Sequence, residues 1–502
     1  MSKNKTVGID LGTTNSAVAY HDERSLHLVE STSGHVLMPS VVAVDKGGKF
    51  TVGHHALRKL KRDFDPEFVF SNIKKQIGMP AQEGEDYTTA YGPQIVAVNG
   101  ERHFIGPNKQ TYSPTELSAE ILKSLKASAD RKLKKPSSGV VITVPAAFDN
   151  NRILDTKEAG LMAGFKRVII KTEPEMAALA FGLHKTPFTR FGVFDLGGGT
   201  FDIAHGTAAK GDINIEPPIG EELGGTDFDK AVWRYLAAAY QQDEGKDLDS
   251  QPIAKLKLMP TIEEAKRELT DLDNAFVRAQ GIYIDYEGGG TRDLQYTITR
   301  EKFDELTKHL VDKTIELTKR LLERDDKTPR DFDEILLVGG MTRVPAVRKA
   351  IEDFFGKARI RDDVNPDYAV VMGAAIAAAQ EDDILPRTFN FSQSVAFSFG
   401  LEDEHGNFAV ALPVGAAPGE IAELVVTTAQ DGQASIPIGI LQGDAGSKAK
   451  DCVRLTRYEH RVQPGPAEKP RISVEFMVDN SGQLTVTGRD QQTNQSFPIR
   501  EP

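Results

Sequence analysis

The sequence contains two copies of one short pattern, and this duplication constrains the fold more than any other feature. Residues 7–20 read VGIDLGTTNSAVAY and residues 192–206 read GVFDLGGGTFDIAHG. In each copy an apolar strand runs into Asp-Leu-Gly, a Gly/Thr turn and a second strand. Asp10 and Asp195 are 185 positions apart, which is too far for the roughly 20–50-residue period of a solenoid. The spacing predicts a duplicated half-domain in which each copy supplies one wall of a cleft.

Strand patterns alternate with helix patterns through the first three quarters of the chain, which predicts α/β layers. Buried strands are expected at 140–145 and 335–340, the second followed by a helix to about Phe355. Another helix is expected over 115–133, opened by a Thr115 cap with Ser118 three residues on. The sequence TIEE predicts a capping box and an amphipathic helix over 261–277.

The character of the sequence changes near Glu381. Residues 381–392 read EDDILPRTFNFS and combine charged, proline and polar residues, which favours a linker. From Gln393 to Pro502 short alternating runs are separated by Gly, Pro and Asp-Gly turns. This spacing is typical of an antiparallel β-sandwich. The predicted organisation is therefore a domain over 1–381, a linker over 382–392 and a β-sandwich over 393–502.

Composition excludes several classes of protein. The chain has 502 residues and a net charge of -12, which argues against a general nucleic-acid binder because such a protein needs a basic face. Its one cysteine, Cys452, excludes an internal disulfide framework and is expected to be a half-buried residue in a reducing compartment. The longest apolar stretch, 369–379, is about half the length of a membrane helix. These features predict a cytoplasmic protein without a membrane partner.

Three glycine turns carry the strongest chemical signal: DLGTT at 10–14, DLGGGT at 195–200 and VGGMTR at 338–343. Glycine lets backbone N–H groups approach phosphate oxygens closely, and threonine hydroxyls add donors. An aspartate at the strand end suits a hydrated Mg²⁺ between phosphates. One such turn alone is commonly an ordinary hairpin, but three together predict a phosphate site. No P-loop sequence occurs.

Several blocks of the sequence resemble the heat-shock protein 70 (DnaK-type) chaperones of the actin and sugar-kinase ATPase superfamily. The matching strings are VGIDLGTTNS, the block over 140–182, FGVFDLGGGTFDI, LGGTDFD at 223–229 and ILLVGGMTRVP. The resemblance covers 5–380 and extends through LQGD at 441–444. It implies an actin-like (ribonuclease H-like) two-lobe α/β ATPase domain, followed by an antiparallel β-sandwich that binds substrate.

The resemblance also implies residue roles for ATP hydrolysis. Lys74 would orient attack on the γ-phosphate, and Glu173 and Asp202 would position and deprotonate water. Asp10 and Asp195 would hold Mg²⁺ through its waters, with K⁺ as a further candidate ion. The residues implied to bind ATP or ADP are Gly12, Thr13, Thr14, Asn15, Gly197, Gly198, Gly199, Thr200, Gly224, Gly225, Glu263, Lys266, Arg267, Thr270, Gly339, Gly340, Arg343 and Asp367.

Two of these implied sites also have a plainer interpretation. Without the resemblance, the 263–270 helix face would be read as a solvated charged surface. The peptide site implied in the β-domain would equally be read as sandwich core. Glu404 stands where the family has an apolar residue, which predicts a preference for peptides with basic flanks. The implied peptide site comprises Phe399, Leu401, Glu404, Val426, Ala429, Ile436 and Ile438.

The sequence departs from the family pattern where the domains are expected to communicate. The apolar linker signature is replaced by FNFSQ at 389–393. Ala147 replaces a tyrosine, and the arginine after Pro145 falls one position early, at Arg152. Ile169 replaces the arginine used by J-domain cochaperones. These changes weaken the expectation of J-domain and nucleotide-exchange partners, whereas unfolded polypeptide clients remain the expected partners.

Three functional interpretations stay open from the sequence. The first is a chaperone whose ATP hydrolysis regulates its affinity for extended apolar peptides. The second is a kinase or actin-like protein on the same ATPase fold. The third is a peptide-binding module with weak interdomain coupling. The sequence stops at FPIREP, so the helical lid of the family is expected to be absent, by nature or by truncation, and peptide exchange to be fast.

Overall fold

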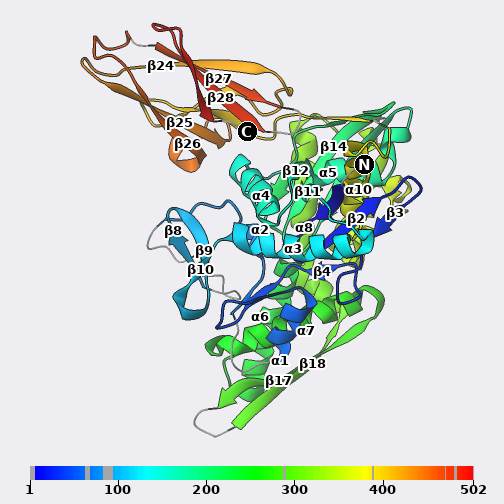
Figure 1. The fold of residues 1–502 in the computed structure, drawn as a ribbon. Helices are drawn as coiled ribbons and strands as arrows, with labels where there is room; N and C mark the ends of the chain where they lie inside the picture. The colour runs from blue at the N-terminus through cyan, green and yellow to red at the C-terminus, as the bar shows by residue number, and fades with distance from the viewer. Residues whose placement is uncertain are drawn as a thin grey trace.

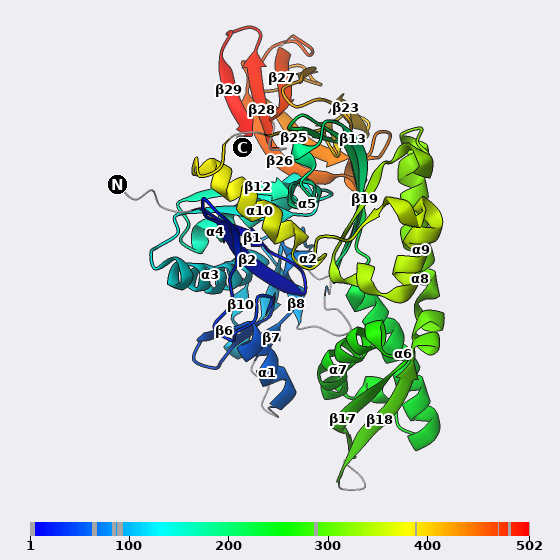
Figure 2. The same cartoon turned by 90° about the vertical axis from the view of Figure 1, so that its right-hand side faces the viewer.

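The computed structural model describes residues 6–62, 68–82, 87, 94–285, 290–386, 389–469, 471–479 and 483–500. Residues 6–381 form the larger, lower part of the molecule in Figure 1, and the C-terminal antiparallel strands lie above it. The same part divides into two sides in Figure 2, one carrying α3 (Pro114–Leu133) and the other carrying α8 (Arg300–Arg324). None of the helices in these ranges has the length and hydropathy of a membrane span.

The first large sheet is built on the hairpin that carries the first Asp-Leu-Gly turn. Its strand β1 (Thr6–Asp10) runs parallel to its neighbour β11, and β11 is fully buried because helices cover both faces of the sheet. The expected strand at 140–145 is thereby confirmed. The sheet order is β12 (Arg167–Thr172), β11 (Gly139–Val144), β1, β2 (Asn15–His21) and β3 (Leu26–Leu28), with β4 (Met38–Pro39) paired to β2.

The second large sheet repeats this plan on the second copy of the pattern. Strand β13 (Thr189–Leu196) forms a hairpin with β14 and runs parallel to β19, as β1 does with β2 and β11. The predicted duplication is therefore visible in the topology. The sheet order is β20 (Ile360–Arg361), β19 (Glu334–Val338), β13, β14 (Phe201–Ala209), β15 (Asp212–Ile215) and β21 (Asn390–Gln393), with β16 (Ile219–Glu221) paired to β14.

Helix α10 (Ala369–Glu381) contacts β1, β2 and β11 of the first sheet as well as α5, and it shares a core with β13 and β19. Gly373 makes this packing possible, because a Cβ there would lie 1.9 Å from the carbonyl oxygen of Met176. The other helices are α1 (His54–Arg62), α2 (Ile73–Gln76), α4 (Asn150–Met162), α5 (Glu173–Ala180), α6 (Gly225–Glu244), α7 (Pro252–Asp271) and α9 (Pro345–Phe355).

Two of the predicted helices differ from the structure at their ends. Helix α3 begins one residue earlier than expected, and Ser113 with Glu116 forms its capping box, so the predicted Thr115 cap with Ser118 is wrong. Helix α7 begins at Pro252, with Pro260 accommodated inside it, so Thr261 is an interior residue and the predicted capping box TIEE is wrong. The helix ends at Asp271, where the chain becomes extended at Leu272. Residues 274–277, expected to be helical, belong instead to strand β17 (Asn274–Asp285), which pairs with β18 (Gly290–Thr299).

Smaller sheets complete the larger part of the molecule. One consists of β5 (Val42–Val44), β6 (Phe50–Val52) and β7 (Phe68–Phe70), and another of β8 (Ile95–Val98), β9 (Glu101–Ile105) and β10 (Thr111–Tyr112). Trp233 belongs to α6 and is 1% exposed, which confirms the expectation that it is a core residue. The helix expected to end near Phe355 is α9, which is likewise confirmed.

Residues 398–500 form two four-stranded antiparallel sheets with one shared apolar core. In the described residues of this region the only helical element is a short 3-10 turn at Ala449–Asp451, in agreement with the all-β expectation. The first sheet has the order β23 (Phe408–Leu412), β22 (Ser398–Glu402), β25 (Ser435–Gly443) and β26 (Val453–Arg461). The second has the order β24 (Ile421–Thr427), β27 (Arg471–Val478), β28 (Leu484–Asp490) and β29 (Ser496–Arg500).

Candidate functional site

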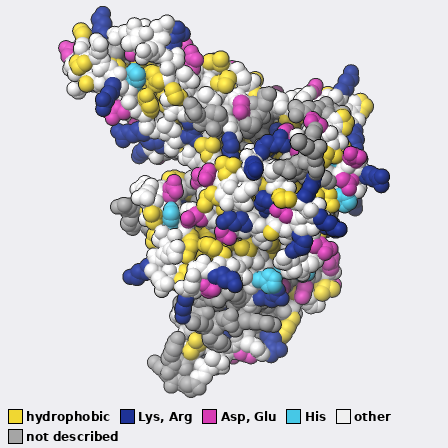
Figure 3. Space-filling view, in the orientation of Figure 1, with side chains coloured by type: hydrophobic (Ala, Val, Ile, Leu, Met, Phe, Trp, Pro, Cys, Tyr) yellow, Lys and Arg dark blue, Asp and Glu magenta, His cyan; other side chains and the backbone are white. Residues whose placement is uncertain are grey.

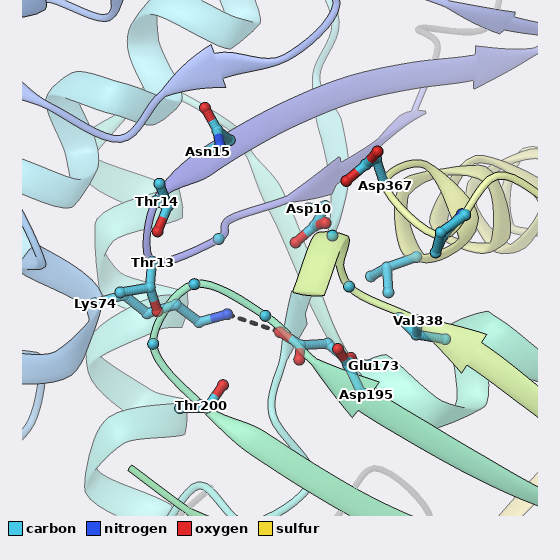
Figure 4. Close-up of a pocket in the computed structure, with 18 of the residues that line it drawn as sticks. Asp10, Thr13, Thr14, Asn15, Lys74, Glu173, Asp195, Thr200, Val338 and Asp367 are labelled. Carbon is cyan, nitrogen blue, oxygen red and sulfur yellow. Dashed lines mark hydrogen bonds and ion pairs between the residues drawn. The ribbon is translucent and has the colours of Figure 1, made fainter. Parts of the chain in front are cut away.

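A cavity opens between the two large sheets, at the strand ends that carry the glycine turns. It holds about 670 Å³ of empty space, part of it open to solvent. All three glycine turns of the sequence meet there, as do Lys74 from α2 and Glu173 from α5 (Figure 4). The predicted residues that line it are Asp10, Gly12, Thr13, Thr14, Asn15, Lys74, Glu173, Asp195, Gly197, Gly198, Gly199, Thr200, Gly339, Gly340 and Asp367.

Within the turn over 197–199, the second and third glycines pack too closely for any side chain. A Cβ on Gly198 would lie 1.8 Å from Thr14 Oγ1, and a Cβ on Gly199 would lie 2.5 Å from Thr13 Cγ2. The start of α6 supports this turn from behind, because Gly225 N donates to Gly197 O and Thr226 N donates to Gly198 O. Gly224 and Gly225 therefore support the turn and do not line the cavity.

Lys74 and Glu173 form a buried ion pair on the floor of the cavity. Lys74 Nζ lies 2.7 Å from Glu173 Oε1, and both side chains are less than a tenth exposed. Figure 4 shows this pair between the turn that carries Thr13 and the strand that carries Asp195. Without the family resemblance, the sequence offers no reason to choose Lys74 over Lys75, whereas the fold gives Lys74 its buried carboxylate partner.

Negative charge is concentrated at the cavity, which is lined by Asp10, Glu173 and Asp195, while the predicted catalytic residue Asp202 lies next to it and outside its lining. Burial, and secondly the carboxylate of Glu173, raise the pKa of Asp10 and of Asp202 to about 7. Burial and the same neighbour raise the pKa of Asp195 as well. Asp202 faces Asp195 across the β13–β14 hairpin, and its Oδ1 atom is buried without a hydrogen-bond partner in the described residues. A cation bound here would relieve this repulsion.

The donor set fits a hydrated Mg²⁺. Oxygen ligands are what this ion prefers, and it commonly keeps several waters. Thr14 Oγ1 is buried and lacks a hydrogen-bond partner in the described residues, so the cavity has polar atoms ready for a ligand. In the same ranges, no group of three His, Cys, Asp or Glu side chains is arranged to hold a metal ion by itself. Because Mg²⁺ commonly keeps several waters, Asp10 and Asp195 would suit contact through water.

The residues of α7 predicted to contact adenosine, and Arg343 on the opposite side, lie outside the lining of the cavity, whereas Gly339, Gly340 and Asp367 line it. Lys266 Nζ donates to Gly225 O and to Asp229 Oδ2, and Asp229 is a buried partner that sequence analysis missed. Arg267 forms an ion pair of 2.6 Å with Glu263, and both belong to α7. Thr270 is one turn further along the same helix. On the opposite side Arg343 Nε donates to Asp367 Oδ2 at 3.0 Å.

Arg152 supports Lys74, although its position departs from the expected pattern. Its guanidinium donates to the carbonyl oxygen of Lys74 at 3.1 Å and stacks over the ring of Phe148 at 3.8 Å. Arg152 is only 9% exposed. Although this arginine falls one position earlier than in the family pattern, it still joins α4 to α2. Nothing in the sequence pattern other than the nearby Pro145 indicated this role.

The segment expected to be a linker is docked on the second large sheet. Strand β21 pairs in parallel with β15, from Asn390 beside Asp212 to Gln393 beside Ile215. Phe389 is 6% exposed and joins the core next to α5 and α10. Phe391 packs against that core, and Lys171 Nζ lies 4.9 Å from its ring centroid. The altered sequence FNFSQ therefore still docks, through two phenylalanines.

A second contact joins the C-terminal sheets directly to α4. Asn150 N donates to Gln442 Oε1 at 3.1 Å, and Arg500 donates to Asn150 Oδ1 at 2.9 Å. Beside them a small cavity is lined by residues of both regions, including Pro145, Phe148 and Phe399. In Figure 3 the two regions meet over a restricted part of the visible face, and the surface is hollowed to one side of it.

The predicted peptide residues divide into buried and exposed groups. Phe399, Leu401, Ile436 and Ile438 are no more than 5% exposed in the shared core of the C-terminal sheets, and Val426 packs against this core. Ala429 follows β24 in a turn, with its N–H bonded to Gln433 Oε1. Glu404 is exposed and lies 3.5 Å from His405. This arrangement is compatible with both interpretations of the apolar positions.

A family model described as Hsp70 protein matches residues 6–501, which is nearly the whole chain. The match includes the residues of the cavity, the docked segment and both C-terminal sheets.

Proposed function

The chain belongs to the Hsp70 family, and from this premise we propose that it is an ATP-dependent chaperone that binds extended apolar segments of unfolded proteins. Family membership supports a chaperone function with ATP binding in general. In the proposal, residues 1–381 are an actin-like two-lobe ATPase domain and 393–502 a substrate-binding β-sandwich. ATP hydrolysis in the first would regulate peptide affinity in the second.

The cavity residues divide the work of phosphoryl transfer among them. Backbone N–H groups of the two Gly/Thr turns would hold the β- and γ-phosphates, with Thr200 beside the γ-phosphate. Lys74, fixed by its ion pair with Glu173, would hold the attacking water in line, and Glu173 and Asp202 would accept its proton. The pKa of about 7 at Asp202 suits a group that takes up a proton near neutral pH.

Asp10 and Asp195 would hold Mg²⁺ through water, and the ion would neutralise charge on the phosphates. Around the adenosine, Lys266 and Arg267 of α7 would lie on one side and Gly339, Gly340 and Arg343 on the other. Arg343 forms an ion pair with Asp367, which lines the cavity, and Arg267 forms one with Glu263 of the same helix.

One observation carries the coupling of the two domains in this proposal. The segment that connects them is itself a strand of the sheet that bears the Asp195 turn. If binding or loss of the γ-phosphate moves β13 and β14, the movement would therefore be transmitted through the sheet to β15 and β21. This argument favours a coupled chaperone over a binding module with weak coupling, which remains the second candidate because Ile169 and Ala147 depart from the family pattern.

Single-turnover ATP hydrolysis with and without an unfolded peptide tests the proposal. We expect peptide to accelerate hydrolysis, because release of the C-terminal sheets from α4, and of β21 from β15, would accompany peptide capture. A rate of hydrolysis that is the same with and without peptide would support the alternative of a peptide-binding module with weak coupling between its domains. Transfer of phosphate to a small acceptor in place of water would support a kinase.

We also expect Mg²⁺ to control nucleotide binding. ADP brings negative charge into a cavity with four carboxylates and one paired lysine, so ADP alone should stabilise the protein little. With Mg²⁺ at a nucleotide concentration of 100 times Kd, the gain in unfolding free energy should be about 2.7 kcal/mol. Thermal denaturation measures this difference. Equal stabilisation by ADP with and without Mg²⁺ would contradict the assignment, and Asp10→Asn should abolish the Mg²⁺ effect.

A further inference from the structure

The small cavity between α4 and the C-terminal sheets has the size and the lining of a binding site for a small molecule. It encloses about 500 Å³ of empty space, part of it open to solvent. Sites for small molecules commonly measure about 300–1,000 Å³ and have mostly apolar walls with a few polar groups. Most of the residues that line this cavity are apolar, and three of them are Phe148, Phe397 and Phe399.

The wall of this cavity is shared between the two regions of the molecule. The larger part supplies Phe148, which precedes α4, and Thr172 at the end of β12. The C-terminal part supplies Phe399 of β22 and Gln442 of β25. Figure 1 shows α4 on the side of the larger part that faces these strands. A molecule bound in the cavity would therefore contact both regions at once.

Asn150 gives the cavity a polar group that lacks a hydrogen-bond acceptor. It lines the cavity and is 3% exposed, and its Nδ2 atom is buried without a hydrogen-bond partner in the described residues. Two other atoms of this residue are already bonded: its backbone N donates to Gln442 Oε1 at 3.1 Å, and its Oδ1 accepts from Arg500 Nη2 at 2.9 Å. A buried donor without an acceptor destabilises a folded protein, so a ligand that supplies an acceptor would remove this cost.

Two buried arginines next to the cavity lack acceptors as well. Arg500 donates to Asn150, and Arg152 stacks over the ring of Phe148. The Nε atom of each arginine is buried and has no hydrogen-bond partner within the described ranges. The carboxylate of Asp149 acts on both arginines, but it already accepts the backbone N–H of Arg152 as the cap of α4. All three unpartnered atoms are donors, and the two guanidinium charges favour an acceptor that is negatively charged.

We propose that this cavity binds a small aromatic monocarboxylate, whose ring packs against the phenylalanines and whose carboxylate accepts a hydrogen bond from Asn150 Nδ2. Because the wall comes from both regions, the bound ligand holds the C-terminal sheets against α4. The binding of the ligand is independent of the proposed ATPase. Its consequence, a weaker acceleration of ATP hydrolysis by peptide, rests on the proposed function.

The probe for this site is 2-naphthoate, and the control ligand is 2-naphthylmethylammonium, which has the same rings and the opposite charge. Calorimetric titration of the full chain measures the affinity for both, without nucleotide and with a non-hydrolysable ATP analogue. We expect a Kd of about 1 mM or lower for 2-naphthoate, as for a ligand of this size. The ammonium analogue should bind at least about tenfold more weakly. Equal affinity for the two probes, or no binding of 2-naphthoate in either condition, would overturn the proposal.

Asn150→Asp tests the position of the ligand. The substitution keeps an acceptor for Arg500 but replaces the Nδ2 donor by a carboxylate oxygen, which repels the carboxylate of the probe. We expect the affinity for 2-naphthoate to fall about tenfold or more. Asn99→Asp, at an exposed position in the turn between β8 and β9, should bind the probe as the unsubstituted protein does. Unchanged affinity in Asn150→Asp would overturn the assigned site.

Ala146→Leu is a second variant that leaves Asn150 in place. Ala146 lines the cavity, so the larger side chain takes up space that the rings of the probe need. Its affinity for 2-naphthoate should also fall, and thermal denaturation shows whether each variant is folded. Unchanged affinity in a folded Ala146→Leu would likewise contradict binding in this cavity.

The effect on the contact between the two regions is measured separately. Saturating 2-naphthoate should slow hydrogen exchange at 389–393 and reduce the acceleration of hydrolysis by peptide, because the docked arrangement is stabilised by the ligand. Binding without any change in hydrogen exchange would refute this holding role. A protein that hydrolyses no ATP would refute the proposed function, whereas the titrations would still decide whether the cavity binds the carboxylate.

Discussion

Replacement of Lys74 by alanine is expected to lower the rate of single-turnover ATP hydrolysis by a factor of about 100 or more, while nucleotide remains bound. The Lys74 side chain is less than a tenth exposed, and its ammonium group forms an ion pair with Glu173. Arg152 donates a hydrogen bond to the backbone carbonyl oxygen of Lys74. In the proposed mechanism the ammonium group stabilises the transition state more than it strengthens ATP binding. Its removal should therefore lower the rate of hydrolysis more than the affinity for ATP. Rapid mixing with ATP measures the rate, and equilibrium titration measures affinity.

The substitution also leaves a buried carboxylate without its partner, which commonly costs about 3–5 kcal/mol of unfolding free energy. Thermal denaturation of Lys74→Ala must therefore show a folded protein before its rate is compared. Lys123→Ala is a matched control, because Lys123 forms an ion pair with Glu120 on the exposed side of α3. Turnover retained in Lys74→Ala would refute the role assigned to this residue.

Replacement of Phe389 by alanine is expected to abolish the acceleration of hydrolysis by peptide. Loss of a buried phenylalanine ring costs about 3 kcal/mol, which shifts the balance between docked and undocked β21 roughly 100-fold toward the undocked state. The ATP cavity itself should be unaffected, because Phe389 is absent from its lining. Hydrogen exchange at 389–393 reports the docking, and single-turnover hydrolysis with peptide reports the coupling.

Phe188→Ala provides the comparison, since that ring is 60% exposed. This control should retain both the protected linker and the response to peptide. If Phe389→Ala responds to peptide as well as the control does, β21 is a structural strand that takes no part in coupling.

The sequence predicted the cavity better than it predicted element ends. Fifteen of the residues implied by the family resemblance meet in one cavity. Of these, only the three glycine turns with their strand-end aspartates were predicted from local pattern, because such turns leave little conformational choice. The end of α7 was missed because residues 274–277 have an apolar spacing compatible with a helix, whereas pairing of β17 with β18 decides their conformation. The Ser113 cap was missed because Thr115 offers a similar hydroxyl two residues later.

Contacts between segments distant in sequence could not be predicted from local pattern. The stacking of His35 on His54 depends on a turn that folds back onto α1. The contact of Arg152 with Lys74 O joins two helices 78 positions apart. The docking of Phe389 depends on a pocket beside α5 and α10 that exists only in the folded chain. In each case the residue type was compatible with the contact, but many other partners were equally compatible.

The dissociation rate of a bound fluorescent peptide, compared between ATP and ADP, tests the central claim most directly. If the domain that binds ATP regulates the C-terminal sheets, peptide should leave the ATP-bound protein faster by about tenfold or more, as for a typical coupling free energy between two sites. Lys74→Ala should show the same fast release with ATP, because binding and not hydrolysis opens the site. Equal rates with ATP and ADP would contradict a nucleotide-regulated chaperone.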